Sequence, residues 1–263
     1  MDENEKKKFF VPRMRNKKLA RLLNRINADE ELRQLWKCAN VNAVDRSDIS
    51  DHGEVHIQIV ANAALKLVRL LVKGGVEPSV VKDHGMTAED AEMIVVLAAC
   101  LHDIGIAIHR DGHEKYSLLI AYPKVRELVS GIYEEPELTI ITSEVMHAIV
   151  AHSAGETCLT IEAGVLKVAD TLDMTEGRSR IPFEAGKVNI HSVSAQAVES
   201  VDIEKGKERP VRIVIKMSNT AGIFQVDELL CGKLRNSTLE SYVEIIAKIN
   251  SKTEPEEIEF YKF

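Results

Sequence analysis

The chain has 263 residues, of which 45% are hydrophobic and 29% are charged, and its 41 acidic and 34 basic side chains give a formal net charge of −7. This length and composition predict one main folded domain plus an appendage, and they exclude disorder as the main state. The acidic balance argues against non-specific coating of nucleic acid, which needs a basic surface. We find no unbroken apolar run of about 18 residues and no signal-peptide core. The four cysteines show no CxxC spacing. We therefore expect a cytoplasmic protein that makes no contact with a membrane.

The first 27 residues are rich in lysine and arginine and also carry an apolar stripe. Leu19, Leu22, Leu23 and Ile26 recur at helical spacing, which predicts an amphipathic helix with a charged face. We interpret it as a solvated helix, and the alternative is an arm that contacts phosphate or nucleic acid. A second helix is predicted at about Asp29–Ala39.

From Asp51 to Met174 the pattern predicts one helix after another, with no strand alternation. Thr87 is a good N-cap for one of them, with two acidic residues in the first turn. The predicted helices are His52–Val72, Ala88–Leu101, His113–Val129, about Leu138–Ala151 and about Thr160–Asp173. We therefore expect a helical domain over residues 1–182, with its core at about 45–180.

After Pro182 the pattern changes to that of a small α+β unit, residues 183–263. In this unit, apolar residues alternate with other residues in a way that is typical of a half-buried strand: Val211, Ile213, Ile215 and Met217 alternate with Arg212, Val214 and Lys216. The further predicted elements are strands at Val188–Val193, Ala197–Ile203 and Glu257–Tyr261 and helices at Gln225–Leu234 and Ser237–Ile249. The predicted fold class is mainly α, a helical bundle with a small C-terminal α+β domain.

Histidines and aspartates at four places in the helical part form a pattern with metal-binding chemistry. Eight of the nine histidines lie between His52 and His152. The pair His102-Asp103 ends an apolar helix, while His56 and Asp170 stand on faces that are otherwise apolar. Each alone would more often be a satisfied core residue. Together, two imidazoles and two carboxylates suit a divalent transition metal and leave coordination positions for water.

The three segments that carry these residues resemble the HD-domain metal-dependent phosphohydrolase superfamily, whose pattern is H…HD…D on a helical bundle. The first is His56-Ile57-Gln58-Ile59-Val60-Ala61, the second is His102-Asp103-Ile104-Gly105, and the third is Val168-Ala169-Asp170-Thr171-Leu172-Asp173. The second segment is similar to the HDIG subgroup. The resemblance covers roughly residues 45–180 and implies one or two divalent ions (Mn, Fe, Zn, Ni, Co or Mg) held by His56, His102, Asp103 and Asp170.

The same resemblance implies further site residues. In some HDIG relatives the histidines that match His113 and His152 hold a second metal, and we expect Asp103 to bridge the two ions because a carboxylate has two oxygens to share. His52, one predicted helical turn before His56, is similar to the general acid in the HxxxH segment of cyclic-nucleotide phosphodiesterases. Arg178 and Arg180 resemble the arginine-rich tail of RNase-Y-type HD domains, so we expect them to bind substrate phosphate.

These implications predict a metal-dependent phosphohydrolase (class EC 3.1) that hydrolyses a nucleotide or another phosphoester with metal-activated water, with His52 and Asp103 as catalytic residues. We expect a small-molecule phosphoester or nucleotide as partner, RNA being possible but not favoured, and a homo-oligomer. An RNA or cyclic-dinucleotide phosphodiesterase is an alternative; the subgroup's lysine and paired histidine are Ile106 and Ser153 here, which weakens a nuclease role. Two further functions stay open: a di-iron oxygenase, which would consume dioxygen, and a non-catalytic nucleotide sensor, which would bind without turnover.

Overall fold

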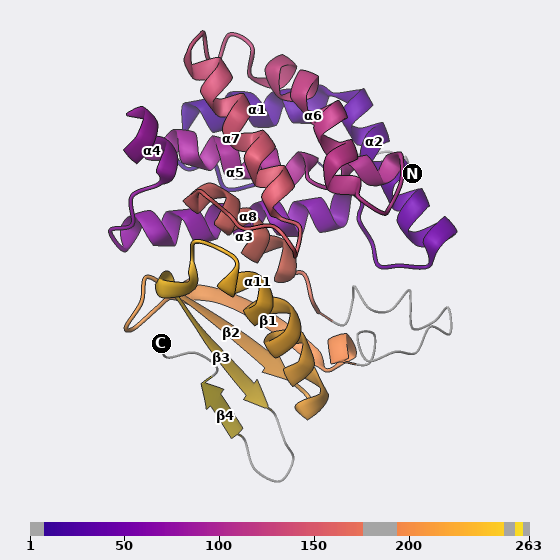
Figure 1. Ribbon diagram of the computed structural model, residues 1–263, viewed down its shortest axis with the longest axis vertical. Coiled ribbons are helices and arrows are strands. Elements are labelled where there is room, and N and C mark those ends of the chain that lie inside the picture. Colours follow the sequence, from indigo (N-terminus) through magenta and orange to yellow (C-terminus); the bar gives the residue numbers. More distant parts are fainter. Residues whose placement is uncertain (1–7, 176–193, 250–255, 260–263) are drawn as a thin grey trace, which may run out of the picture.

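The computed structural model describes residues 8–175, 194–249 and 256–259. Helices fill one part of the molecule and a small sheet with its own helices forms the other, as Figure 1 shows. The mainly α fold class with a small C-terminal α+β unit is therefore confirmed. The helices of the first part are α1 (Lys17–Ala28), α2 (Glu30–Asn40), α3 (Glu54–Lys73), α4 (Ser79–His84), α5 (Ala88–Leu101), α6 (His113–Val129), α7 (Glu137–Ala151) and α8 (Ile161–Thr171). The predicted boundary at residues 182 and 183 lies outside the described residues and stays a prediction.

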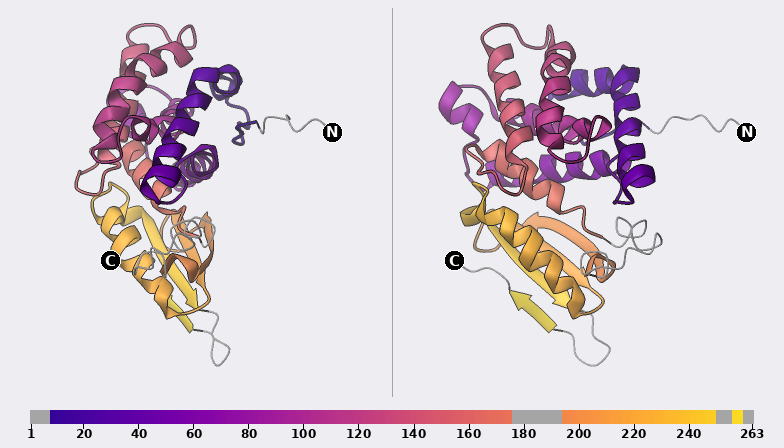
Figure 2. Two further views of the ribbon diagram at one scale, coloured as in Figure 1. Left: turned by 90° about the vertical axis from the view of Figure 1, so that its right-hand side faces the viewer. Right: turned by 45° about the vertical axis from the view of Figure 1, so that its right-hand side comes forward.

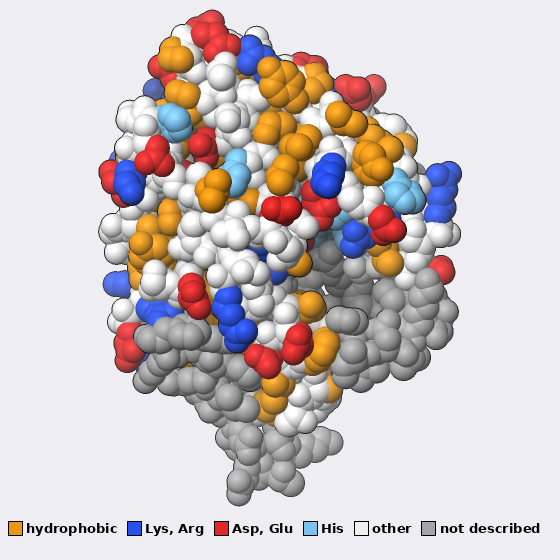
Figure 3. Space-filling model, in the orientation of Figure 1, with side chains coloured by type: hydrophobic (Ala, Val, Ile, Leu, Met, Phe, Trp, Pro, Cys, Tyr) orange, Lys and Arg blue, Asp and Glu red, His pale blue; other side chains and the backbone are white. Residues whose placement is uncertain are grey.

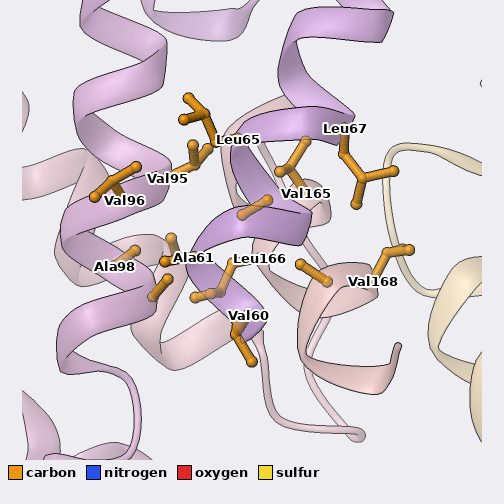
Figure 4. Close-up of a cluster of buried hydrophobic side chains, with 14 of the residues drawn as sticks. Val60, Ala61, Leu65, Leu67, Val95, Val96, Ala98, Val165, Leu166 and Val168 are labelled. Atoms are coloured by element: carbon orange, nitrogen blue, oxygen red, sulfur yellow. The ribbon is translucent and has the colours of Figure 1, made fainter. Parts of the chain in front are cut away.

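The core of the helical part forms where α3, α5 and α8 meet. Helix α5 is apolar on all sides and fully buried along most of its length, as expected of a central helix. Val60 and Ala61 of α3 and Val165 and Leu166 of α8 pack in this core, which Figure 4 shows in close-up. Because interiors are close-packed, this contact fixes how the ends of the three helices lie relative to one another.

Helix α3 is, among the described helices, the one with the length and apolar composition of a membrane span. Half of its most apolar stretch is buried inside the protein, and the core helix of a globular protein passes the same test. The match by length and composition is thus weak support for a membrane span.

The predicted amphipathic helix at the N-terminus is present as α1, and its apolar stripe is buried. Its arginines bind within the molecule: Arg25 Nη1 donates to the carbonyls of Leu128 (2.8 Å) and Ser130 (2.6 Å), and Arg21 Nη2 donates to that of Gly131 (2.8 Å). These carbonyls lie at the C-terminal end of α6, where backbone acceptors lack helical partners and cations are favoured. Arg21 and Arg25 therefore hold α1 to the end of α6, and Figure 3 shows acidic and basic side chains interspersed over the face in view.

The C-terminal unit is built on a four-stranded sheet in the order β1-β2-β3-β4. Strand β1 (Val198–Lys205) pairs antiparallel with β2 (Val211–Met217), β2 pairs parallel with β3 (Val243–Ile249), and β3 pairs antiparallel with β4 (Glu256–Glu259). Parallel neighbours need a crossover connection. A π-helical segment, Gln225–Cys231, and the short helix α11 (Gly232–Arg235) provide it and cover one face of the sheet (Figures 1 and 2). The predicted strand Val188–Val193 lies outside the described residues.

The predicted helix Ser237–Ile249 is wrong, because most of that range forms β3. Val243, Ile245, Ala247 and Ile249 share one face of the strand and are all buried. Its intervening residues Glu244 and Ile246 are buried too, so both faces of the strand are largely covered and the run of apolar residues loses the clear alternation of a half-exposed strand. The abundance of β-branched residues was the signal for a strand.

Candidate metal centre

Six residues from the ends of five helices converge in the helical part and are mostly buried. His56 stands in the first turn of α3, His102 and Asp103 follow α5, and His113 begins α6; His152 follows α7, and Asp170 lies in the last turn of α8. The sequence prediction named all six, and the structure brings them together. We call them the histidine–aspartate cluster: His56, His102, Asp103, His113, His152 and Asp170.

The chain turns sharply after Asp103, and the close packing of this turn explains why residue 105 is glycine. Ser117 of α6 ties the turn together, since its hydroxyl accepts a hydrogen bond from the backbone N–H of Gly105 (2.9 Å) and donates to the carbonyl of His102 (2.6 Å). A Cβ on Gly105 would lie 2.1 Å from the carbonyl oxygen of His113. The missing side chain therefore lets α6, and with it His113, lie directly against the His102-Asp103 pair.

The first group of ligand atoms surrounds His56 and His102. Oδ2 of Asp103 lies 3.4 Å from His56 Nε2 and 3.1 Å from His102 Nε2. Oδ1 of Asp170 lies 3.4 Å from His56 Nε2 and 3.8 Å from His102 Nε2. Two imidazoles and two carboxylates thus face a common point, the set that the sequence pattern predicted for one ion.

The second group lies on the other side of Asp103. Its Oδ1 is 3.0 Å from His113 Nε2 and 3.8 Å from His152 Nε2. The ligand atoms of His56, His102 and Asp103, and those of Asp103, His113 and His152, lie within 4.8 Å of one another in each set. Asp103 therefore turns one oxygen toward each pair of histidines.

Every imidazole of the cluster has its Nδ1 next to an acceptor. Nδ1 of His56 lies 2.7 Å from Asp173 Oδ2, and those of His102, His113 and His152 lie 2.9, 3.1 and 2.5 Å from the carbonyls of Ala99, Arg110 and Ile149. In His56, His102 and His152, an Nδ1–H that donates to these acceptors leaves the lone pair of Nε2 free, which is how metal-binding histidines are held. Nδ1 of His113 also lies 3.0 Å from Arg110 Nη1, which can only donate. Nε2 of His56 is only 3.4 Å from Nε2 of His102, so two lone pairs would face each other without a cation or proton between them. The donor set fits a divalent ion.

Electrostatics also favour positive charge at this point. Burial disfavours the charged form of His102, but Asp103 and Asp170 outweigh it and raise the pKa of His102 to about 10. Burial would raise the pKa of Asp103, but His102, His113 and His56 hold it well below its usual range. Burial and the neighbouring charge on His102 lower the pKa of His152 to about 4. The cluster thus keeps its carboxylates ionised while buried, which requires a compensating cation or proton.

Asp173 and Lys233 contact the carboxylate and imidazole ligands of the cluster and were not predicted as site residues. Asp173, which orients His56, lies three residues after Asp170, and a second carboxylate in that segment was the available signal. Lys233 of α11 reaches Asp170 Oδ2 with its Nζ at 2.6 Å. Burial alone would raise the pKa of Asp170, but the pKa is well below its usual range, and the charge of Lys233 is the largest of the causes that lower it. Nothing in the sequence around Lys233 pointed to this contact.

His52 lies beside the cluster, but not on the helix. The prediction that the helix begins at His52 is wrong by two residues, since α3 begins at Glu54. The His52 ring is still close to His56, with 5.4 Å between ring centroids, and is buried. Its Nδ1 is 2.6 Å from the carbonyl of Ser50, and its backbone N–H donates to Asn40 Oδ1 at 3.0 Å. Contacts with Ser50 of the preceding loop and with Asn40, the last residue of α2, and not a helical turn, place it there.

Arg178 and Arg180 lie outside the described residues. His147, near the end of α7, accepts a hydrogen bond on Nε2 from the backbone N–H of Leu159 at 3.1 Å.

Comparison with known proteins agrees with this geometry. The family model of the HD domain matches residues 56–175, a range that contains the whole histidine–aspartate cluster and Asp173. An uncharacterized protein of Methanocaldococcus jannaschii, MJ1020, is 44% identical over 224 residues, which are 85% of this chain and 86% of that protein. That length exceeds the 197 residues that precede β1, so the likeness includes part of the C-terminal unit. The chain belongs to the HD-domain superfamily of metal-dependent phosphohydrolases.

Proposed function

We propose that this protein is a metal-dependent hydrolase of a nucleotide or another small phosphoester. The observation that carries the proposal is the position of Asp103, which directs one oxygen to His56 and His102 and the other to His113 and His152. Such an arrangement of shared carboxylate and imidazoles supports catalysis at one or two divalent ions.

The ligands divide between two ions. His56, His102, Asp103 and Asp170 would hold the first, and His113, His152 and again Asp103 would hold the second. A bound divalent cation would supply Lewis acidity, lowering the pKa of a water molecule and neutralising charge on phosphoryl oxygens. Asp173 and the backbone carbonyls of α5 and α7 keep the imidazoles of His56, His102 and His152 in the tautomer that binds.

His52 is proposed as the general acid. Its Nδ1 is engaged by the Ser50 carbonyl, so the proton for transfer is the one on Nε2. The ring stands beside His56 at the edge of the first group of ligands, where the leaving oxygen of a phosphoester at that group would depart. Arg178 and Arg180 are proposed to bind the phosphoryl oxygens through paired hydrogen bonds.

A di-iron oxygenase is the second candidate, because the same set of four histidines and two aspartates also suits that chemistry. The buried, shared Asp103 is compatible with both. Hydrolysis is favoured because the family of the HD domain is one of phosphohydrolases.

The experiment begins with the metal content of the protein as purified, followed by a hydrolysis screen over the six candidate metals. The substrates are nucleoside mono- and triphosphates, cyclic mono- and dinucleotides, a short RNA and an aryl phosphate, and dioxygen uptake is recorded with the iron-loaded protein. We expect hydrolysis of a mononucleotide or another small phosphoester. In Asp103→Ala, which removes an oxygen from both groups of ligands, we expect metal content to fall and activity to vanish while the protein stays folded.

Three results would overturn the proposal. Dioxygen uptake without hydrolysis would identify an oxygenase. Tight nucleotide binding without turnover under every metal would identify a sensor. Full metal occupancy in Asp103→Ala would show that the cluster is not the metal site.

A further inference from the structure

One cation from the C-terminal unit reaches the cluster in the helical part. Lys233, in the short helix α11, places its Nζ 2.6 Å from Asp170 Oδ2, and the lysine side chain is only 20% exposed. The other oxygen of Asp170, Oδ1, is the one that faces His56 and His102. The two oxygens of this carboxylate therefore have separate partners.

The position of Lys233 depends on how α11 and the segment after it dock on the helical part. The carbonyl of Asn236 accepts a hydrogen bond from the backbone N–H of Cys158 (3.1 Å), and Thr238 Oγ1 donates to the carbonyl of Thr160 (2.9 Å). Gly164 of α8 lies against the same segment, and a Cβ there would come within 2.6 Å of Thr238 Oγ1. These contacts hold residues 236–238 close to α8, whose last turn carries Asp170.

An ion pair at this place has a cost that a surface pair does not have. Both partners are largely removed from water, so each loses hydration that their attraction must offset, and a lysine that only covered the surface could extend into solvent instead. The pair fixes the orientation of the Asp170 carboxylate, because it occupies one oxygen and leaves the other for the cluster. Partners of this kind commonly orient the ligands of a metal.

We propose that Lys233 is a positioning residue for Asp170, so that the C-terminal unit completes the metal centre of the helical part. The inference rests on the proposed metal-dependent function, but its main readout does not require activity. By holding Oδ2, Lys233 restricts Asp170 to one oxygen toward the ion and keeps a coordination position open for water or substrate.

The test is Lys233→Met, which keeps the apolar stem and removes the charge, loaded with Co²⁺ in the full-length protein. We expect cobalt to bind with unchanged stoichiometry and no weaker affinity, because a like charge beside the ion has gone. The visible absorption of cobalt should change, because Asp170 can then offer both oxygens. On the best substrate of the screen, kcat should fall about 10–100-fold. Lys233→Arg, which keeps a cation at this position, should recover part of the wild-type spectrum.

Two results would overturn the proposal. An unchanged cobalt spectrum and unchanged kcat would make Lys233–Asp170 an ordinary ion pair. Loss of cobalt together with loss of thermal stability would make Lys233 a residue of the fold alone. If the wild-type protein hydrolyses nothing in the screen, the proposed function fails, but the cobalt spectra still test the role of Lys233.

A matched pair of glycine variants tests whether docking delivers the lysine. Gly164→Ala pushes on Thr238, whose hydroxyl is already held by Thr160, so the segment carrying Lys233 should move and the cobalt spectrum should shift as in Lys233→Met. Gly232→Ala, next to Lys233, adds a methyl group where no atom lies within 4 Å and should keep the wild-type spectrum. A folded Gly164→Ala protein with the wild-type spectrum would contradict delivery by docking.

Discussion

Each histidine of the cluster is oriented by a partner on its second nitrogen. His102 and His152 follow the last residues of α5 and α7, and each Nδ1 lies near the carbonyl three residues earlier in its own helix. Carbonyls at helix C-termini lack helical donors, so the imidazole satisfies one of them while its own tautomer is fixed. His56 stands near the start of its helix, where no such carbonyl is available, and Asp173 takes that part. His102 and His152, at helix C-termini, thus use carbonyls of their own helices, whereas His113 and His56, at helix starts, lie against the carbonyl of Arg110 in the preceding loop and the carboxylate of Asp173.

The role of His52 is testable at the scale of one residue. In His52→Asn, which cannot serve as an acid at this position, we expect metal content to stay and the rate on an alkyl or nucleoside phosphoester to fall by roughly 10²–10⁴-fold. The loss should be much smaller on an activated aryl phosphate, whose leaving group departs without a proton. The measurement is kcat/KM on both substrates. An equal loss on the two would assign His52 to binding or to metal positioning.

At the scale of elements, the site exists because α3 and α6 begin, and α5, α7 and α8 end, at one place. Helical periodicity predicted these helices, and the H…HD…D segments predicted His56, His102, Asp103 and Asp170, since amphipathic helices and short motifs are local properties of the sequence. The resemblance to the HDIG subgroup added His113 and His152. Strand β3 was mistaken for a helix because side chains on both of its faces are buried, so its sequence lacks the alternation of a half-exposed strand. Lys233 could not be predicted, because its contact with Asp170 spans 63 residues and depends on the docking of two units. Local signals found the ligands, and long-range packing added what positions them.

The turn after Asp103 gives a prediction for the element that carries His113. In Gly105→Ala the new Cβ would lie 2.1 Å from the carbonyl of His113 and 2.3 Å from the backbone nitrogen of Ser117, and a backbone cannot yield as a side chain can. We expect α6 to move away from the turn, with a loss of about 1–3 kcal/mol in the free energy of unfolding. Urea unfolding measures this loss, and metal analysis should show fewer ions per chain because the second group of ligands is disturbed.

The matched control is Gly155→Ala, where no atom lies within 4 Å of the new Cβ. It should change stability by no more than about 0.5 kcal/mol. Equal stability and metal content in the two variants would show that close contact at Gly105 is not what holds His113.

At the scale of the whole molecule, segments outside the matched HD region also hold the site. Trp36 of α2 donates its indole N–H to the carbonyl of Cys100, two residues before His102, at 2.8 Å. Asn42 Nδ2 donates to the carbonyls of Ile106 (2.7 Å) and Ala107 (3.0 Å), in the turn after Asp103. Trp36 and Asn42 precede the matched region in the sequence, and Lys233 follows it. The N-terminal helices and the C-terminal unit therefore both contact the metal centre or the backbone next to its ligands. The HD region therefore forms the site together with its neighbours in the chain.

The joint between the N-terminal helices and the bundle gives a pH-dependent prediction. Asp90 at the start of α5 accepts hydrogen bonds from Lys18 of α1 (2.6 Å), from Tyr133 (2.5 Å) and from the hydroxyl (2.7 Å) and backbone N–H (3.0 Å) of Thr87. Burial opposes its charge, but these bonds outweigh burial and lower the pKa of Asp90 below its usual 3.8. A lowered pKa in the folded state means that the carboxylate stabilises the fold fully above the unfolded pKa and loses this effect as the pH falls through the folded value.

Asp90→Asn should therefore lower the free energy of unfolding by about 2 kcal/mol at pH 7, because bonds to a charged acceptor are replaced by bonds to an amide that also carries donors. The difference from the wild type should stay constant between pH 5 and 7, well above the unfolded pKa, and shrink below about pH 4 as Asp90 of the wild type takes up its proton. Urea unfolding of both proteins across this range measures it, and comparing the two removes the contribution of the carboxylates that they share. A difference that grew as the pH fell would have the opposite sign and would mean that Asp90 holds its proton more tightly in the folded protein than in the unfolded chain.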